Sequence, residues 1–128
     1  MIFTNNKDKV LLIDDDASLR RQLRVHLDKH RNFEVIEASN CETGLAQAKS
    51  EKPNLIVLDW MMPDTQGDEV LTRLKHDSTT RDIPVIMLTG KNKIGEIEDA
   101  FDLGADSYLT KPFEVKKLGD KASEMLGG

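Results

Sequence analysis

Four short apolar runs in this chain each end at a residue that can bind phosphate or a divalent metal ion. Residues 10–13 are followed by Asp14, Asp15 and Asp16, residues 55–58 by Asp59, residues 83–88 by Thr89, and residues 108–110 by Lys111. Such continuous runs are typical of strands buried on both faces, as in a parallel sheet covered by helices. Ligands of open parallel sheets bind outside the carboxyl ends of the strands. We therefore expect carboxylates, a hydroxyl and an ammonium group to meet at one edge of a sheet.

The segments between these runs have the apolar spacing of amphipathic helices. Helices are expected over residues 17–30 and 40–50, after the turn at 63–67, over 92–102, and over a final segment that includes Leu118; another strand is expected over 33–37. Strands that alternate with helices predict an α/β fold with right-handed crossovers. Asp16 is the expected N-cap of the first helix, and Gly104 is expected to end the fourth. Gly119 lies inside the final helix, where glycine costs about 1 kcal/mol relative to alanine.

Length and composition are those of a single acidic domain. The chain has 128 residues, a net charge of -5 and one cysteine, Cys41. The acidic balance and the lack of a basic stripe argue against direct binding of nucleic acid. A lone cysteine cannot form an internal disulfide, which fits a reducing compartment. No signal peptide or membrane-spanning segment is recognisable, so we expect a cytoplasmic protein with no membrane partner.

The aspartates favour a magnesium site that handles phosphate. Mg²⁺ prefers octahedral oxygen ligands, usually one or two carboxylates with waters and a phosphate oxygen. Asp14 and Asp15 meet that requirement, although an acidic run after a strand is also a common solvated loop and helix cap. Asp59 directly follows four apolar residues, where an acid is costly unless it is exposed at the sheet edge or paired. Beside Mg²⁺ its carboxylate is suited to attack a phosphoryl group; the alternative is an acid that caps a loop.

Thr89 and Lys111 supply the remaining groups that a transferred phosphoryl group needs. A hydroxyl with its neighbouring backbone N–H, and an ammonium charge, can hold the phosphoryl oxygens. Each residue is uninformative alone, because Thr-Gly is ordinary turn chemistry and Lys-Pro an ordinary surface dipeptide. Their occurrence at separate strand ends, together with the aspartates, is hard to obtain by accident.

Together these motifs resemble the receiver domain of two-component response regulators. The resemblance rests on Asp14-Asp15, on Leu58-Asp59 with Pro63 and Gly67 downstream, on Leu88-Thr89-Gly90, and on the segment from Tyr108 to Phe113. It implies a doubly wound, flavodoxin-like α/β fold, with a parallel sheet of five strands in the order 2-1-3-4-5 flanked by five helices. Residues 9–126 would form the receiver domain, residues 1–8 an N-terminal extension, and residues 127–128 a tail or the start of a linker.

The resemblance also implies a role for each site residue. Asp59 would be the phosphoacceptor; Mg²⁺ would be bound by Asp14, Asp15, Asp59 and the Met61 backbone carbonyl; Thr89 and Lys111 would contact the phosphoryl group; Thr89 and Tyr108 would form a conformational switch. The bond between Lys111 and Pro112 is expected to be cis. Apolar Met61 and cationic Lys91 occupy positions that tune phosphoryl lifetime in the family, and slow self-dephosphorylation is expected.

As a member of this family, the chain would be a phosphorylation-activated signalling switch rather than an enzyme. It would catalyse only its own phosphotransfer and slow self-dephosphorylation. The donor would be a sensor histidine kinase or a phosphotransfer protein. The expected output is altered association with an effector protein, an output domain or a second copy, through the helix over 92–102, the fifth strand and the helix after Phe113. This face carries mixed charges, at Lys91, Lys93, Glu96, Glu98, Lys116 and Lys117.

Two alternatives remain open at this point. In a haloacid-dehalogenase-type phosphohydrolase, Asp14 would be the nucleophile of an Asp-x-Asp motif. Against it, no acidic pair follows Lys111, Asp59 is unexplained, and the chain is too short for a cap domain. The second alternative is a degenerate receiver that only binds a partner, which the intact set of aspartates, threonine and lysine argues against.

Overall fold

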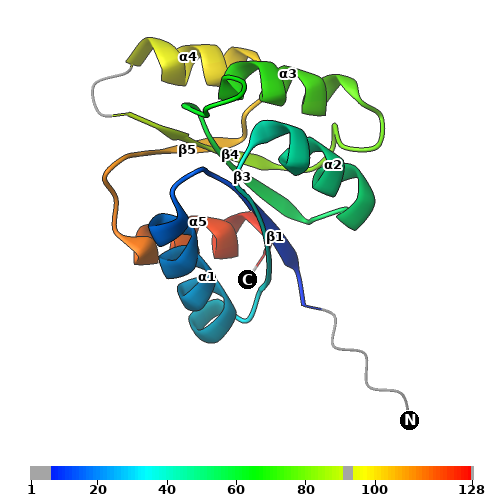
Figure 1. Cartoon of the computed structure of the whole chain (residues 1–128). Coiled ribbons are helices and arrows are strands. Elements are labelled where there is room, and N and C mark those ends of the chain that lie inside the picture. Colours follow the sequence, from blue (N-terminus) through cyan, green and yellow to red (C-terminus); the bar gives the residue numbers. More distant parts are fainter. Residues whose placement is uncertain (1–6, 91–93, 128) are drawn as a thin grey trace.

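One parallel sheet with helices on both of its faces makes up the fold (Figure 1). The computed structural model describes residues 7–90 and 94–127. Along the chain the elements are β1 (Lys9–Ile13), α1 (Ala17–Arg31), β2 (Glu34–Ala38), α2 (Cys41–Glu51), β3 (Leu55–Asp59), α3 (Gly67–His76), β4 (Val85–Thr89), α4 (Ile94–Asp102), β5 (Ser107–Thr110) and α5 (Val115–Met125). The strand order is β2-β1-β3-β4-β5, and every neighbouring pair is parallel. The predicted fold class is confirmed.

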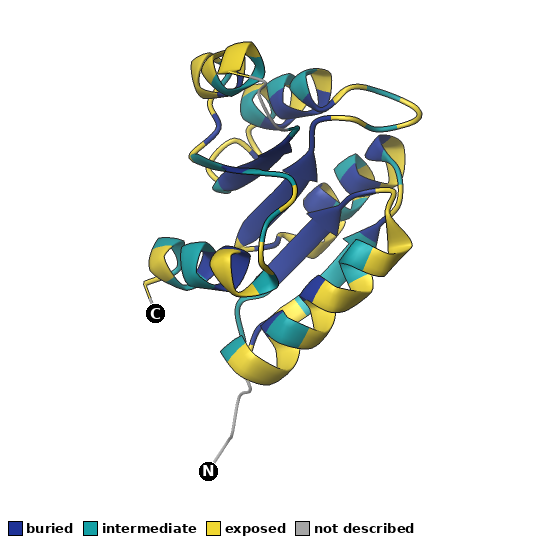
Figure 2. Ribbon diagram, turned by 90° about the vertical axis from the view of Figure 1, so that its left-hand side faces the viewer, coloured by how far each residue is buried: buried dark blue, intermediate teal, exposed yellow. Residues whose placement is uncertain are grey.

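The sheet divides the interior into two hydrophobic cores. Successive side chains of a strand point to opposite faces, so Leu11 and Ile13 of β1 join the core beneath α2, α3 and α4. Val10 and Leu12 join the other core, beneath α1 and α5. Every residue of β3 and β4 is buried, and Figure 2 shows the central strands enclosed by helices that are exposed on their outer sides. Burial on both faces explains why the strand sequences are continuously apolar.

The ends of the helices follow local capping chemistry. Asp16 accepts a hydrogen bond from the Leu19 N–H at 3.1 Å, which confirms it as the N-cap of α1. Asn40 caps α2 rather than being its first residue, and β2 begins one residue later than predicted. Gly104 follows α4 with a φ of 109°, a conformation that favours glycine. The predicted start of that helix near Asn92 lies outside the described residues.

Gly119 has a packing role that the sequence analysis did not predict. The helices α1 and α5 lie side by side on one face of the sheet (Figure 1). A Cβ atom on Gly119 would lie 2.6 Å from His26 Nε2 and 3.0 Å from Arg31 Nε. The missing side chain lets α5 approach α1 closely enough for Arg31 to donate hydrogen bonds to Asp120 and Ser123. The helix-propensity cost of this glycine is therefore accompanied by a close contact between helices.

Two further expectations concern the chain path. The peptide bond between Lys111 and Pro112 is cis, as expected. Among the helices of residues 7–90 and 94–127, none combines the length and the hydrophobicity that crossing a bilayer requires. The proposed N-terminal extension lies mostly outside the described residues, as does Gly128 at the other end.

Candidate functional site

The polar residues that follow four of the strands meet at the carboxyl edge of the sheet. Asp14 follows β1, whereas Asp59 and Thr89 end β3 and β4; their exposed fractions are only 1%, 5% and 1%. Asp15 is exposed. One carboxylate oxygen from each of Asp14, Asp15 and Asp59 lies within 4.8 Å of the other two. The structure thus brings together the three aspartates that the sequence singled out.

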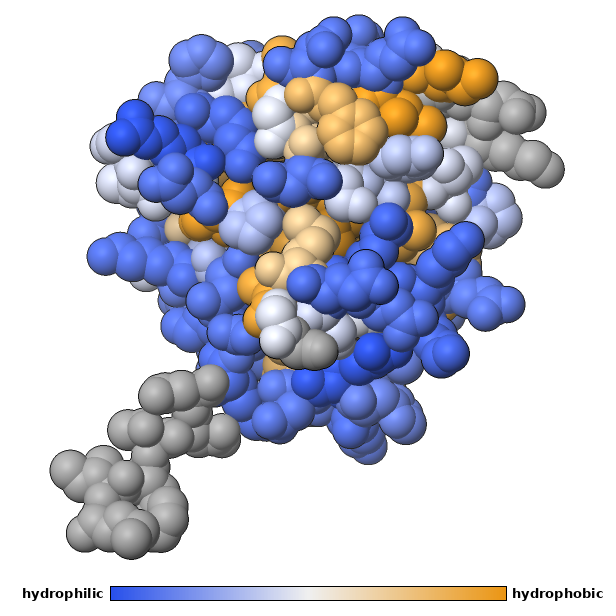
Figure 3. All heavy atoms as spheres, turned by 180° about the vertical axis from the view of Figure 1, so that it is seen from behind, coloured by the Kyte–Doolittle hydropathy of each residue, from blue (hydrophilic) through white to orange (hydrophobic). Residues whose placement is uncertain are grey.

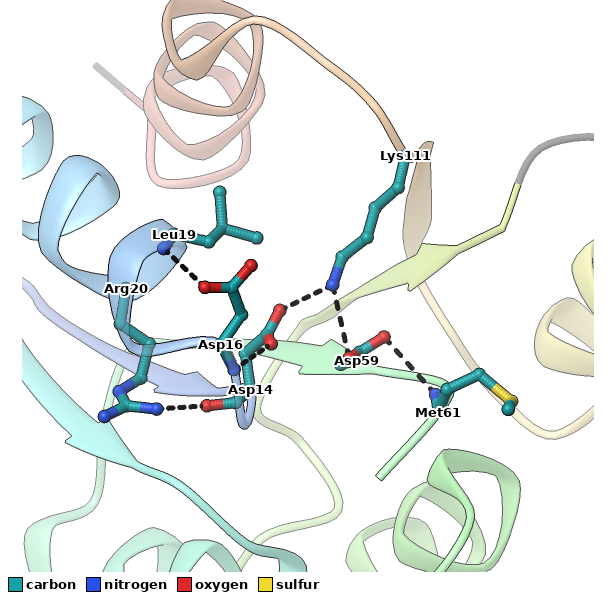
Figure 4. A network of polar contacts seen from close by, with 7 residues as sticks. All are labelled: Asp14, Asp16, Leu19, Arg20, Asp59, Met61 and Lys111. Carbon is teal, nitrogen blue, oxygen red and sulfur yellow. Dashed lines mark hydrogen bonds and ion pairs between the residues drawn. The ribbon is translucent and has the colours of Figure 1, made fainter. Parts of the chain in front are cut away.

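Lys111 bridges two of these carboxylates (Figure 4). Its Nζ donates to Asp14 Oδ2 at 2.9 Å and to Asp59 Oδ2 at 3.2 Å. Burial alone would lower the pKa of Lys111, but the hydrogen bonds and charges of Asp14 and Asp59 outweigh it and raise the pKa above its usual value. The lysine is therefore a fixed cation in this site and not a candidate base.

Asp59 is held in an environment that disfavours its charge. Burial, followed by the negative charge of Asp14, raises the pKa of Asp59 to about 6. The Lys111 ammonium and the Met61 N–H, which donates to Asp59 Oδ1 at 3.3 Å, offset only part of that rise. At neutral pH the carboxylate is thus ionised but poorly compensated, and an added cation would stabilise it.

Thr89 and Tyr108 lie on the neighbouring strands β4 and β5. The Thr89 hydroxyl is buried and has no hydrogen-bond partner among the described residues. Its backbone carbonyl accepts from the Lys111 N–H at 2.7 Å, which keeps β4 and the lysine together. Tyr108 is half-buried, and its ring stands edge-on to that of Phe101 in α4, with centroids 5.7 Å apart. A buried hydroxyl without a partner is costly, so an acceptor bound at this edge would satisfy Thr89.

The donor set suits a hard divalent cation. Three carboxylates lie within reach of one ion, and Lys111 is the one ammonium group hydrogen-bonded to them within residues 7–90 and 94–127. Mg²⁺ is bound through carboxylate, carbonyl and water oxygens, which these residues offer. Met61 is 65% exposed, and its thioether has no oxygen atom to offer. Only the backbone carbonyl of Met61 is therefore a candidate ligand.

Two contacts beside the site were not predicted. Arg20 of α1 donates from Nη1 to the backbone carbonyl of Asp14 at 2.6 Å. Asp64, in the loop after β3, accepts hydrogen bonds from the backbone N–H groups of Cys41 and Glu42 at the start of α2. The sequence contains no periodic signal for either contact, because each joins a charged side chain to the backbone of another element.

A comparison with protein families bears on the phosphohydrolase alternative. The model of the response regulator receiver domain matches residues 10–123. The chain belongs to this family. The receiver domain is thereby assigned to a family of signalling switches, as predicted, and the comparisons give no support to the phosphohydrolase alternative.

Relatives of the receiver domain include transcriptional regulators. It is 42% identical over 117 residues to the phosphate regulon transcriptional regulatory protein PhoB of Pseudomonas aeruginosa, covering 91% of this chain and 51% of the relative. It is 39% identical over 113 residues to PhoB of Escherichia coli, covering 86% of this chain and 48% of the relative. The chain thus spans about half the length of these curated relatives.

Solved structures of receiver proteins have the same fold. The chemotaxis response regulator CheY4 of Vibrio cholerae superposes with a TM-score of 0.85 at 27% identity, covering 94% of this chain and 99% of that one. A CheY-like response regulator receiver domain protein of Methanospirillum hungatei superposes with a TM-score of 0.87 at 28% identity, covering 95% of each chain. The predicted resemblance is therefore confirmed at the level of both sequence and fold.

Proposed function

We propose that the receiver domain is a phosphorylation-activated switch whose phosphoacceptor is Asp59. The observation that carries the proposal is the convergence of Asp14, Asp15, Asp59 and Lys111 at one edge of the sheet. The proposed phosphoryl donor is a sensor histidine kinase or a phosphotransfer protein in the cytoplasm. Residues 9–126 form the proposed domain, with residues 1–8 as an extension and 127–128 as a tail or the start of a linker.

The proposed reaction transfers a phosphoryl group from a donor imidazole to the carboxylate. An Asp59 oxygen attacks phosphorus, the phosphorus–nitrogen bond breaks, and its electron pair stays on the imidazole nitrogen, which takes up a proton. Lys111 and Thr89 donate hydrogen bonds to the phosphoryl oxygens. A Mg²⁺ ion held by Asp14, Asp15, Asp59 and the Met61 carbonyl would neutralise the repulsion between carboxylates and phosphoryl group. No other substrate is transformed, so the domain is a switch and not an enzyme in the ordinary sense.

Mapping the phosphorylated residue tests this proposal. Protein treated with acetyl phosphate and Mg²⁺ is reduced with borohydride, which converts an acyl phosphate into an alcohol that mass spectrometry locates. We expect modification of Asp59, its loss in Asp59→Asn, and its loss when EDTA removes the metal. Modification at Asp14 would support the phosphohydrolase, and modification at no residue would support a degenerate receiver.

The proposed output begins at Thr89 and ends at α4. Phosphorylation adds about 1.5 to 2 negative charges and three acceptor oxygens, and the unpartnered Thr89 hydroxyl is available to turn toward them. Tyr108 has an apolar ring and a polar tip, so both buried and exposed rotamers are tolerable. Its edge-on contact with Phe101 couples that choice to α4, which makes a two-state element that the site is able to bias.

The proposed output surface consists of α4, β5 and α5. Ile94 and Phe101 of α4 are 69% and 46% exposed, and Figure 3 shows hydrophobic atoms gathered at this end of the molecule. The same surface carries charged residues of both signs, at Glu96 and Glu98 of α4 and at Lys116 and Lys117 of α5. Lys91 and Lys93, also expected here, lie outside the described residues. An effector protein, an output domain or a second copy of the domain is the proposed occupant.

Amide chemical shifts with and without beryllofluoride, a mimic of the phosphoryl group, test the switch. We expect shifts at Asp14 and Asp59, at Tyr108, and through residues 94–102. Leu45 of α2 is the internal control and is expected to stay unchanged. Shifts confined to the loops that hold the aspartates would refute the switch while leaving the phosphoacceptor chemistry intact.

A further inference from the structure

Asp14 is held by contacts on both its backbone and its side chain. Its N–H donates to the carbonyl of Ala38 at 3.1 Å. Its carboxylate accepts from Lys111 Nζ and from the Asp16 N–H, each at 2.9 Å. Its carbonyl accepts from Arg20 Nη1 at 2.6 Å. Arg20 therefore completes a set of contacts that leaves this residue little freedom (Figure 4).

Glu37 orients the Arg20 guanidinium. Arg20 Nε donates to Glu37 Oε1 at 3.1 Å, and the two side chains are 16% and 27% exposed. Glu37 belongs to β2, whose register pairs it with Leu12 of β1, close to the end of that strand. A guanidinium is a planar fork with several donors. The Nε–H of Arg20 thus donates to the Glu37 carboxylate, while its Nη1–H donates to the backbone carbonyl of Asp14.

We propose that Arg20, oriented by Glu37, is the positioning residue for the acidic loop that binds Mg²⁺. The inference rests on the proposed function, because it concerns the metal site of the same switch. The Asp14 carbonyl and the Asp15 N–H belong to one planar peptide group, so fixing the carbonyl also fixes the start of Asp15. Within the described part of the chain, no hydrogen bond or ion pair holds the Asp15 carboxylate itself. The direction of the exposed Asp15 side chain therefore depends on the orientation of the peptide group whose carbonyl accepts from Arg20.

Positioning and simple charge effects predict opposite outcomes for metal binding. The Arg20 cation repels a dication, so removing its charge would by itself tighten Mg²⁺ binding. Removing a positioning contact would loosen it, because groups that orient metal ligands typically contribute about 10- to 100-fold to affinity. The sign of the change therefore separates the two roles.

Arg24 offers a matched control. Its Nη1 lies 3.2 Å from Glu37 Oε2, so it pairs with the same carboxylate as Arg20, but it has no hydrogen bond to Asp14 and is 53% exposed. Like Arg20→Ala, Arg24→Ala thus removes one positive charge and one ion pair with Glu37. Unlike Arg20→Ala, it removes no hydrogen bond to Asp14. Arg20→Lys keeps the charge and a single donor nitrogen but loses the planar fork of donors.

A titration with Mg²⁺ followed by Trp60 fluorescence tests the proposal. Trp60 is the single tryptophan of the chain, follows Asp59 directly and is 5% exposed. We expect Arg20→Ala to weaken Mg²⁺ binding about 10-fold, Arg20→Lys to recover part of that loss, and Arg24→Ala to match wild type. In metal-free protein, the ¹⁵N shift of the Asp15 amide is expected to move in Arg20→Ala and to stay in place in Arg24→Ala.

Affinity in Arg20→Ala equal to or tighter than wild type would overturn the positioning role. An equal loss in Arg24→Ala would overturn it as well, since charge or folding would then explain the effect. If Arg20→Ala does not fold, wild-type affinity in Arg20→Lys contradicts the role and a weakened affinity supports it. Failure of wild type to bind Mg²⁺ would instead count against the proposed function. In that case the ¹⁵N shift of the Asp15 amide still tests the positioning role, and an unchanged shift in Arg20→Ala would overturn it.

Discussion

In metal-free protein, Asp59→Asn is expected to raise the free energy of unfolding by about 3 kcal/mol near neutral pH. Burial, followed by the charge of Asp14, raises the pKa of Asp59 from 3.8 to about 6. The native state thus binds the Asp59 proton more tightly than the unfolded chain does, so wild-type stability falls as the pH rises from about 4 to about 6. Above that window the ionised carboxylate lowers the free energy of unfolding by about 1.4 kcal/mol for each unit by which its pKa is raised. Asparagine avoids it.

Urea denaturation in EDTA, at about pH 7.5 and about pH 4, measures this effect. The two proteins are expected to differ at the higher pH and nearly to converge at the lower, where Asp59 is protonated in the native state and about half protonated in the unfolded chain. Lys111 keeps its hydrogen bond to Asp14, so the amide leaves no unpaired ammonium group. Asp82→Asn, at an exposed position outside the cluster, is the control and should match wild type at both pH values. Asp59→Asn that is no more stable than wild type at neutral pH would contradict the prediction.

Gly67→Ala is expected to lower the free energy of unfolding by about 2 to 3 kcal/mol. A Cβ atom on Gly67 would lie 2.6 Å from the carbonyl oxygen of Asp59 and 2.8 Å from the Cα of Trp60. Both are backbone atoms at the end of β3, so relief requires the sheet edge or α3 to move. The Gly67 N–H also donates to the Trp60 carbonyl at 2.8 Å, which ties the start of α3 to the same segment. Displacing it is expected to slow phosphorylation of Asp59 as well.

Gly95→Ala is the matched control for added helix propensity. Gly95 lies in α4, and nothing lies within 4 Å of a Cβ atom added there. Alanine in a helix is favoured over glycine by about 1 kcal/mol, so this variant is expected to be as stable as wild type or slightly more stable. Equal stability of both alanine variants would show that the close approach at Gly67 has no energetic consequence.

Much of the fold was predictable because the burial of each strand is visible in the apolar pattern of its own residues. Residues 55–58 are continuously apolar since both faces of β3 are covered, and that pattern depends on the strand alone. Asp16 was predictable as a cap for a similar reason, because it bonds Leu19 only three residues away. The approximate place of the site followed from the rule that parallel strands end at the same edge. The order of the strands came from the resemblance of the motifs, not from the apolar pattern.

Other features required the tertiary structure because they depend on distances between residues far apart in the chain. Lys111 bridges Asp14 and Asp59, which are 97 and 52 residues away, and the raised pKa of Asp59 needs both burial and the nearby Asp14 charge. From the sequence alone, Gly119 was expected only to destabilise its helix, whereas the structure shows that its lack of a side chain makes room for His26 of α1.

The sequence by itself predicted the class of the fold, the residues of the candidate site and the edge of the sheet where they meet. It did so because periodicity, capping and strand ends are local properties of the chain. Only the tertiary structure decided that Lys111 pairs with two carboxylates at once, that Gly67 contacts the backbone of β3, and that Arg20 grips the Asp14 carbonyl. Each of these depends on the packing of one element against another, and that packing sets distances which no local pattern encodes.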